Sequence, residues 1–364
     1  MIITKEAVIN ALNKISLPGE GKNIIDRGAV SNIMIFGDQI DIDIQLENPS
    51  LQARKKLEVT ILKTIHEMVY EKAKIKINIK VVSPPAEENT IKGKPIKGIE
   101  NVIAISSGKG GVGKSTVTAN IAVTLAQMGC KVGVLDADIY GPSIPTMFDM
   151  EGARPLSVQV DGKSMMEPIE NYGVKVLSIG FFTKPEQAVI WRGPMAAKAL
   201  NQMIFDASWG ELDFLLIDLP PGTGDIHLSI VQSLPLNGAV VVSTPQNVAL
   251  ADAKKGISMF QQENIQVPVL GIVENMSYFS PAEMPDQQYF IFGKDGGKKL
   301  AEQFEVPFLG EIPLVQSVGE SSDSGAPISL QENHPTAIAM ANIASKVAQQ
   351  VALINAGLHQ NNLI

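Results

Sequence analysis

The first part of the chain alternates apolar and polar side chains over short stretches. Two of these stretches, Gln39–Leu46 and Ile75–Val81, predict β-strands with one buried face, and a shorter strand is predicted at Asn32–Phe36. Two longer stretches place apolar residues at helical spacing: Lys5–Ile15, with Thr4 as a candidate N-cap, and Leu51–Ala73. The resulting order, α-β-β-α-β, predicts a small α/β domain over residues 1–82.

The second part of the chain has apolar runs that barely alternate. Five runs predict buried strands: Asn101–Ser106, Lys131–Leu135, Phe214–Ile217, Ala239–Ser243 and Val267–Val273. Helical patterns separate these strands, which is typical of a parallel sheet covered on both faces. Residues 83–98 are rich in Pro, Lys and Glu without apolar periodicity, and they predict an exposed linker. The fold class is therefore α/β, with a parallel-sheet domain flanked by helices over residues 99–364.

One glycine-rich loop carries the clearest candidate chemistry. Ser106–Thr116 reads Ser-Ser-Gly-Lys-Gly-Gly-Val-Gly-Lys-Ser-Thr and fits the phosphate-loop pattern. It lies between a predicted strand and the helical pattern Thr116–Met128, the context in which such a loop binds phosphate. Glycines let backbone N–H groups surround a phosphate, and the helix N-terminus adds partial positive charge. We expect Lys114 to reach the β- and γ-phosphates of ATP and Ser115 to ligate Mg²⁺.

Two acidic loops follow strands that should lie beside the phosphate loop. Asp136 and Asp138 follow the strand ending at Leu135, and Asp218 follows Phe214–Ile217. Ligands of open α/β sheets bind at the carboxyl ends of the strands, so these loops should converge on the phosphate loop. Asp218 has the form of a Walker B acid that holds Mg²⁺, although an Asp that caps a turn has the same pattern. Asp138 is the candidate that orients the attacking water, and Asp136 either supports the metal shell or caps its strand.

Composition narrows the classes of partner. The 364 residues carry a formal net charge of −8, which argues against a general nucleic-acid surface. No apolar run of membrane-spanning length and no signal peptide is expected. Pro335–Leu353 predicts a packing helix whose single lysine, Lys346, does not favour a basic membrane-binding helix. One cysteine, Cys130, excludes an internal disulfide, which suits a cytoplasmic protein.

Lys109 is an addition to the general phosphate-loop pattern, because binding a phosphate with backbone N–H groups requires no lysine directly after Gly108. The loop resembles the deviant phosphate loop of the nitrogenase iron protein, MinD and ParA class. That resemblance implies that Lys109 reaches across a dimer to the partner's nucleotide; the alternative is a solvated loop charge. It also implies that Asn275 reads adenine, unless Asn275 is a turn residue. The expected catalytic group is Lys109, Lys114 and Asp138, and the expected nucleotide contacts are Gly108, Lys109, Gly110, Gly111, Val112, Gly113, Lys114, Ser115, Thr116 and Asn275.

Six motifs carry a closer resemblance: Gly108–Ser115, Asp136–Ser143, Trp191–Met195, Asp218–Asp225, Ser243–Gln246 and Glu274–Ser277. Together they resemble the Mrp/ApbC family of iron–sulfur cluster carrier ATPases. The resemblance implies an ATP- and Mg²⁺-dependent homodimer that carries a [4Fe–4S] cluster between assembly proteins and apoprotein clients. The small first domain is similar to one found in iron–sulfur assembly proteins. That domain often has a cysteine near Pro49–Ser50, and its absence here favours an interaction module without chemistry.

The same family holds its cluster with a Cys-x-x-Cys pair from each subunit. The corresponding stretch here, Tyr278–Tyr289, has no cysteine, and Cys130 is expected to pack in the core. The sequence therefore identifies no cluster ligands, since clusters need thiolates or occasionally histidines. The main interpretation is an ATP-hydrolysing iron–sulfur carrier or assembly factor. The alternatives are a MinD- or ParA-like dimerisation switch and a nucleotide-dependent scaffold without a cluster.

Overall fold

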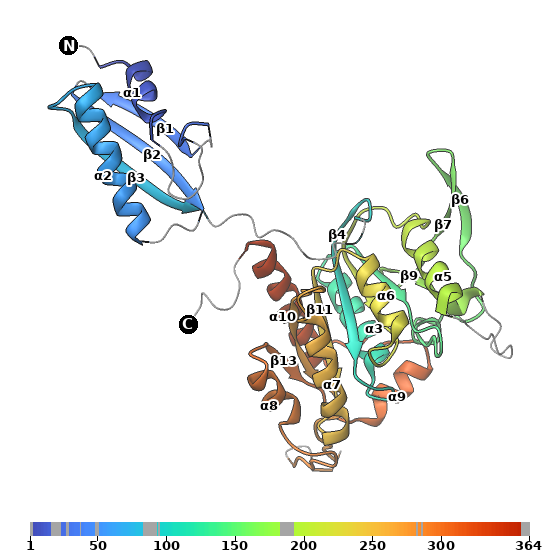
Figure 1. Ribbon diagram of the computed structural model, residues 1–364. Helices are drawn as coiled ribbons and strands as arrows, with labels where there is room; N and C mark the ends of the chain where they lie inside the picture. The colour runs from blue at the N-terminus through green and yellow to red at the C-terminus, as the bar shows by residue number, and fades with distance from the viewer. Residues whose placement is uncertain are drawn as a thin grey trace. The chain divides into compact units, whose positions relative to one another are not determined.

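The computed structural model describes residues 3–15, 23–26, 29–36, 38–47, 51–82, 93, 95–182, 193–281, 283–284 and 287–357. The contacts within the chain divide it into two compact units, residues 1–88 and residues 89–364 (Figure 1).

The first unit has the predicted order of elements. They are α1 Lys5–Leu12, β1 Val30–Phe36, β2 Gln39–Glu47, α2 Leu51–Met68 and β3 Lys74–Val82. Strand β2 lies in the middle, antiparallel to β1 and parallel to β3. Its alternating Ile40, Ile42 and Ile44 are fully buried, and Ile61 and Ile65 of α2 join them in one core. Helix α2 is shorter than predicted because a turn precedes β3.

The second unit contains an eight-stranded sheet and a separate two-stranded hairpin. Its strands are β4 Ile99–Ser107, β5 Val132–Asp136, β6 Leu156–Val160, β7 Lys163–Glu167, β8 Ile169–Asn171, β9 Val174–Ser178, β10 Leu212–Asp218, β11 Gly238–Ser243, β12 Val269–Glu274 and β13 Phe308–Glu311. Its helices are α3 Lys114–Gln127, α4 Ile144–Met147, α5 Gly193–Phe205, α6 Asp225–Ser233, α7 Asn247–Phe260, α8 Gly296–Gln303, α9 Gln316–Asp323 and α10 Pro335–Asn355, with 3₁₀ turns at Ile179–Phe182 and Ile328–Leu330.

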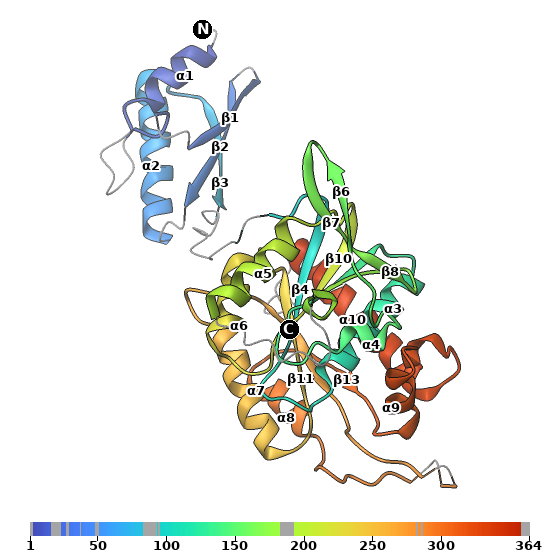
Figure 2. The ribbon, with the colours of Figure 1, turned by 90° about the vertical axis from the view of Figure 1, so that its right-hand side faces the viewer.

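The order of strands places the candidate loops together. The sheet runs β13-β12-β11-β4-β10-β5-β9-β8, and all neighbours are parallel except β8, which is antiparallel to β9. Strand β4, which leads into the phosphate loop, lies between β10 and β11, and β5 lies beyond β10. The carboxyl ends of β4, β10 and β5 therefore meet at one edge of the sheet. Figure 2 shows β4 beside β10. The structure confirms the predicted helix-flanked parallel sheet.

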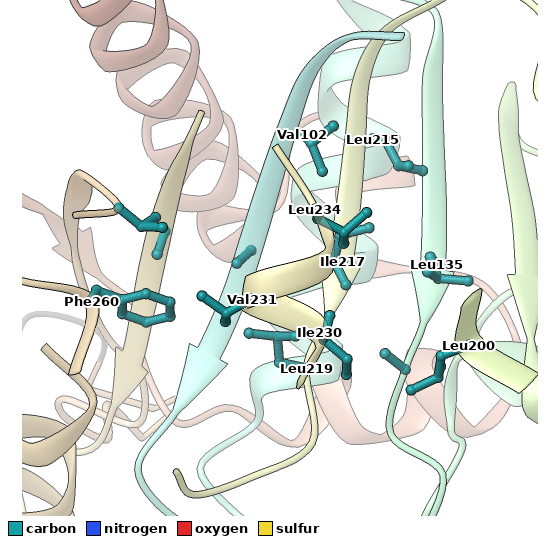
Figure 3. Close-up of a cluster of buried hydrophobic side chains, with 14 of the residues drawn as sticks. Val102, Leu135, Leu200, Leu215, Ile217, Leu219, Ile230, Val231, Leu234 and Phe260 are labelled. Carbon is teal, nitrogen blue, oxygen red and sulfur yellow. The ribbon is translucent and has the colours of Figure 1, made fainter. Parts of the chain in front are cut away.

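Helices cover both faces of this sheet, because its central strands are apolar on both sides. In β4, Val102 and Ala104 belong to one buried cluster, whereas Ile103 and Ile105 belong to the other. Helices α5, α6, α7 and α8 contribute to the first cluster, and α3, α4 and α10 contribute to the second. Figure 3 shows the first cluster, where Ile230 of α6 lies close to Ile217 of the sheet. This packing fixes the position of the loop between β10 and α6.

Helix α10 is long and apolar enough, by length and composition, to cross a membrane, and within the described part of the chain it alone meets that criterion. This helix differs from the sequence-based expectation that no apolar stretch reaches that length. In the structure, Met340, Ile343, Val347 and Val351 are buried in the second cluster, where α10 contacts α3. This arrangement matches the predicted packing helix.

Candidate functional site

The glycines of the phosphate loop have two separate structural roles. Gly111 and Gly113 have φ angles of +79° and +82°, a region that side chains with a Cβ disfavour. Gly113 is also the N-cap of α3 and supplies no side-chain cap, so the first N–H groups of the helix remain available to a ligand. At Gly108, a Cβ atom would collide with the backbone of Asp252 and Ala253 in α7. Gly108 is therefore needed for the close approach of the loop to α7.

This difference predicts unequal effects of two alanine substitutions in one loop. Gly108→Ala is expected to lower the free energy of unfolding by about 2 kcal/mol, because helix backbone must move to admit the methyl group. Gly110→Ala is the matched control, since the nearest atom to its added Cβ, Pro221 Cγ, lies 4.0 Å away and its φ is not positive. Urea unfolding of both variants checks this, and equal destabilisation would contradict the assigned role of Gly108.

Lys114 is buried among carboxylates at the centre of the site. Its Nζ donates a hydrogen bond to Asp218 Oδ2 at 2.7 Å and lies 3.6 Å from Asp138 Oδ2. The Lys114 side chain is 6% exposed and the Asp218 side chain 1%, so the solvent screens their attraction weakly. The structure thus brings together the loops that follow β4, β5 and β10.

Asp218 accepts hydrogen bonds from three side chains of the loop and helix α3. Besides Lys114, they are Ser115, whose Oγ lies 2.6 Å from Oδ2, and Thr118, whose Oγ1 lies 2.7 Å from Oδ1. Sequence reasoning missed Thr118. The available signal was a threonine four residues after Lys114, on the face of α3 that turns toward the sheet. A buried carboxylate beside a serine hydroxyl is an oxygen donor set of the kind that Mg²⁺ prefers.

Asp136 lies at the end of β5 and is completely buried. Its carboxylate accepts hydrogen bonds from Ser178 Oγ at 2.8 Å and from the Asp138 backbone N–H at 3.1 Å. Burial, together with the nearby Asp218 carboxylate, raises the pKa of Asp136 to about 8. Burial also raises the pKa of Asp138, while the Lys114 ammonium opposes that rise. The hydrogen bonds show Asp136 organising the loop that carries Asp138; a role in the metal shell stays a prediction. Ser178 was also missed by sequence reasoning.

The raised pKa of Asp136 predicts that stability falls with rising pH. An aspartate in the unfolded chain loses its proton near pH 3.8, whereas folded Asp136 keeps it up to about pH 8. The folded state therefore binds more protons across this window, so its stabilisation is present below the window and is lost as the pH rises through about 8. His227, whose pKa burial lowers from 6.5 to about 4, has the opposite effect, but only below pH 6.5.

The measurement is therefore made between about pH 6.5 and pH 8, without nucleotide. We expect the melting temperature of the wild-type chain to fall by about 4 °C across this interval. Asp136→Asn should show a smaller fall, because it removes the titrating carboxyl while keeping the shape of the side chain. Circular dichroism measures the melting temperatures. Equal falls in the wild-type chain and in Asp136→Asn would contradict this assignment.

Two other predicted residues lie on or against the phosphate loop. Lys109 is partly exposed, and among the described residues no carboxylate lies within 4.0 Å of its ammonium group. Asn275 is buried, and its side-chain amide donates to the Val112 carbonyl at 2.9 Å and accepts from the Met276 N–H at 3.0 Å. This places Asn275 as a support of the phosphate loop. Its contact with adenine, like the trans role of Lys109, stays a prediction.

His227 is buried at the start of α6, directly behind the loop that follows β10. Its Nδ1 lies 3.3 Å from the Pro220 carbonyl, and its ring lies 5.8 Å from the ring of Phe260. The lowered pKa keeps the imidazole neutral near pH 7, so its Nδ1–H donates to Pro220 and tethers this loop to the core. At the other end of the same loop, the Gly222 N–H donates to the Ser107 carbonyl at 2.9 Å.

The candidate iron–sulfur residues are not gathered into a ligand set. Cys130 is partly buried against the second cluster, and burial raises the pKa of its thiol. In the stretch that replaces the Cys-x-x-Cys pair, Phe279 and Tyr289 exchange backbone hydrogen bonds of 2.9 and 2.8 Å. Within the described ranges, no group of three or more His, Cys, Asp or Glu side chains could hold a metal ion. Trp191, Arg192 and Asp286 lie outside the described residues.

Comparison with known families decides the classification. The family model for the NUBPL iron-transfer P-loop NTPase matches residues 98–350. The chain belongs to this family. A second family model, that of an iron–sulfur cluster assembly protein, matches residues 5–75 and covers most of the first unit.

Individual relatives agree with membership of the NUBPL iron-transfer family. An iron–sulfur cluster carrier protein of Synechocystis is 41% identical over 357 residues, covering 97% of this chain and 99% of that protein. One from Escherichia coli K12 is 51% identical over 264 residues, covering 72% of this chain and 70% of that protein. Among solved structures, a nucleotide-binding protein in complex with ADP from Archaeoglobus fulgidus matches with a TM-score of 0.56 and 41% identity, covering 65% of this chain and 90% of that one.

Proposed function

We propose that this chain binds and hydrolyses ATP as a homodimer and acts in the cytoplasm as an iron–sulfur cluster carrier or assembly factor. The observation that carries the nucleotide part is the buried contact of Lys114 with Asp218 and Asp138, at the edge of the sheet where the phosphate loop ends. The cluster part is supported by family membership and by relatives named iron–sulfur cluster carrier proteins.

Phosphoryl transfer requires mainly positioning and charge, and the residues present can supply both. Lys114 and the N–H groups at the start of α3 bind the phosphates. Ser115 and Asp218 would hold Mg²⁺, which neutralises charge that develops on the phosphate oxygens. Asp138 lies beside Lys114 and orients the attacking water, and Asp136 holds the Asp138 loop in place. Lys109 extends from the loop toward a second subunit and adds a positive charge to that subunit's nucleotide.

The cluster is cargo in this proposal, and its ligands come mainly from other proteins. Each chain has one cysteine, and the thiol of Cys130 is not activated, since its pKa is raised. Two chains would provide two such thiols, fewer than the four thiolates of an ordinary [4Fe–4S] site. We therefore propose that the nucleotide-driven dimer assists transfer between assembly proteins and apoprotein clients that contribute thiolates.

The shortage of cysteine also supports a second candidate function. A dimerisation switch or scaffold of the MinD or ParA kind would use the same nucleotide site without handling a cluster. This alternative needs no metal ligands, which agrees with the lack of a candidate ligand group in the described residues. Family membership favours the first candidate.

Two anaerobic measurements separate the two candidates. In the first, the full chain is incubated with iron and sulfide and its bound iron is measured; the second follows cluster transfer. The full chain is mixed with a cluster-loaded donor and an apo-enzyme, and the recovery of enzyme activity is followed with and without Mg·ATP. We expect Mg·ATP to accelerate recovery, and Lys114→Met to remove the acceleration. Cys130→Ser, tested alongside, should transfer as well as the wild type. If the chain neither binds iron nor accelerates transfer, the carrier function is wrong and the switch is favoured.

A further inference from the structure

A basic groove lies between α7 and α8, outside the nucleotide-binding residues. It has a volume of about 450 Å³, and its lining includes three lysines, Lys254, Lys294 and Lys299. No Asp or Glu lines it, although the chain has 38 Asp and Glu residues and only 30 Lys and Arg residues. The groove therefore carries a concentrated positive charge, although the protein as a whole is acidic.

The three lysines are available to a partner. All are exposed, and among the described residues none has a carboxylate within 4.0 Å. Lys294 is held in place, since its Nζ lies 4.7 Å from the centroid of the Phe290 ring. The adjacent Lys255, by contrast, pairs with Asp252 at 3.0 Å and does not line the groove.

Apolar side chains also line the same groove. Leu250 of α7 and Leu300 of α8 line it together with Pro245. The helices approach closely there, because a Cβ on Gly296 would lie 2.7 Å from Leu250 Cδ1. A ligand that fits therefore has an apolar side chain flanked by negative charges. A free inorganic anion would leave these apolar side chains without a partner.

We propose that the α7–α8 groove binds an acidic segment of a partner protein, with carboxylates on the three lysines and an apolar side chain on Leu250 and Leu300. This proposal rests on the groove alone and does not depend on ATP hydrolysis or on cluster transfer. Its failure would therefore be distinguishable from a failure of the proposed function.

The walls of the groove also contact the phosphate loop. Backbone of α7 at Asp252 and Ala253 lies against Gly108. The first turn of α8 donates its Gly297 N–H to the buried carboxylate of Glu274, and the next residue, Asn275, bonds the loop carbonyl of Val112. Binding in the groove and binding of nucleotide should consequently affect each other, by the same factor in both directions.

The chain offers a matched pair of variants for the test. Lys254→Gln with Lys299→Gln removes two charges from the groove. Lys255→Gln with Lys298→Gln removes two charges from the neighbouring positions of the same helices, and neither residue lines the groove. Equal melting temperatures and equal ATP hydrolysis establish that both double variants are folded.

The probe is a fluorescein-labelled peptide, Glu-Glu-Leu-Phe-Glu-Glu, whose binding to the full chain is followed by fluorescence anisotropy at low salt. We expect the groove variant to bind it about tenfold more weakly than the wild type, and the neighbouring variant to bind within about twofold. The same peptide with Gln in place of every Glu should not bind. Equal weakening in both variants, no binding to the wild type, or displacement by an equal concentration of inorganic phosphate would overturn the proposal.

The coupling is tested with the same probe. The peptide dissociation constant is expected to change by about fivefold or more between the nucleotide-free chain and the chain saturated with a non-hydrolysable Mg·ATP analogue. Identical constants would show that the groove acts independently of nucleotide and would overturn the coupling.

Discussion

Replacing Lys114 with methionine is expected to lower kcat/KM for ATP by at least about 100-fold and to abolish tight nucleotide binding. The side chain is the buried positive charge that lies between Asp218 and Asp138 at the end of the phosphate loop. Methionine keeps most of the length and the apolar stem but removes the ammonium group. Steady-state hydrolysis and equilibrium dialysis with labelled ATP measure the two effects.

The same substitution should also affect folding. Removing one partner of a buried ion pair leaves an uncompensated carboxylate, which costs about 3 kcal/mol. Lys131→Met is a suitable control, because Lys131 pairs with Glu211 at 2.9 Å on the surface, where both side chains are more than half exposed. We expect this control to hydrolyse ATP normally and to unfold at nearly the same urea concentration as the wild type. Normal nucleotide binding by Lys114→Met would contradict the assignment of the phosphate loop.

Replacing Lys109 with alanine is expected to lower kcat for ATP about 100-fold while nucleotide affinity stays within about threefold. This lysine is partly exposed on the phosphate loop and is not paired with a described carboxylate. Its charge is therefore free to act on a second subunit's nucleotide. Hydrolysis and analogue binding are measured on the same preparation. An equal loss of affinity in Lys109→Ala and Lys114→Met would contradict the separate roles.

Mixing the two inactive variants tests whether Lys109 acts across a dimer. In a mixed dimer, the Lys109→Ala chain keeps its own Lys114 and receives Lys109 from the Lys114→Met chain, so one of the two sites is complete. An equal mixture should recover roughly a quarter of wild-type hydrolysis, because half the dimers are mixed and each has one complete site. If chemical cross-linking of differently tagged chains shows that mixed dimers have formed, a mixture as inactive as its components would show that Lys109 acts within its own chain.

The sequence predicted the elements that build the sheet because their patterns are strong. Near-continuous apolar runs became the parallel strands β4, β5, β10, β11 and β12, and the phosphate loop lies between β4 and α3. Boundaries were less accurate, as in α2, which ends at Met68 instead of Ala73, and the strands β6, β7, β8, β9 and β13 were not predicted. Boundaries depend on turns and on tertiary contacts, which local periodicity does not encode.

The site was predictable in its charged residues and less so in the residues that orient them. Asp138 and Asp218 stand at or just after strand ends, and Lys114 closes the loop that follows β4, so the topology of an open α/β sheet could place all three. Thr118 and Ser178 lie far from Asp218 and Asp136 in the sequence, and their hydrogen bonds arise only when helix and strands pack. Asn275 likewise supports Val112 across 163 positions of the chain, a contact that no local pattern indicates.

The central claim is that the loops after β4, β5 and β10 together hold one Mg²⁺-bound triphosphate per chain. Isothermal titration calorimetry of the full chain with a non-hydrolysable ATP analogue tests it most directly, with and without Mg²⁺. We predict one nucleotide bound per chain, at least about tenfold tighter with Mg²⁺, and loss of this Mg²⁺ effect in Asp218→Asn. No heat of binding to the wild-type chain, or the same Mg²⁺ effect in Asp218→Asn, would contradict the account.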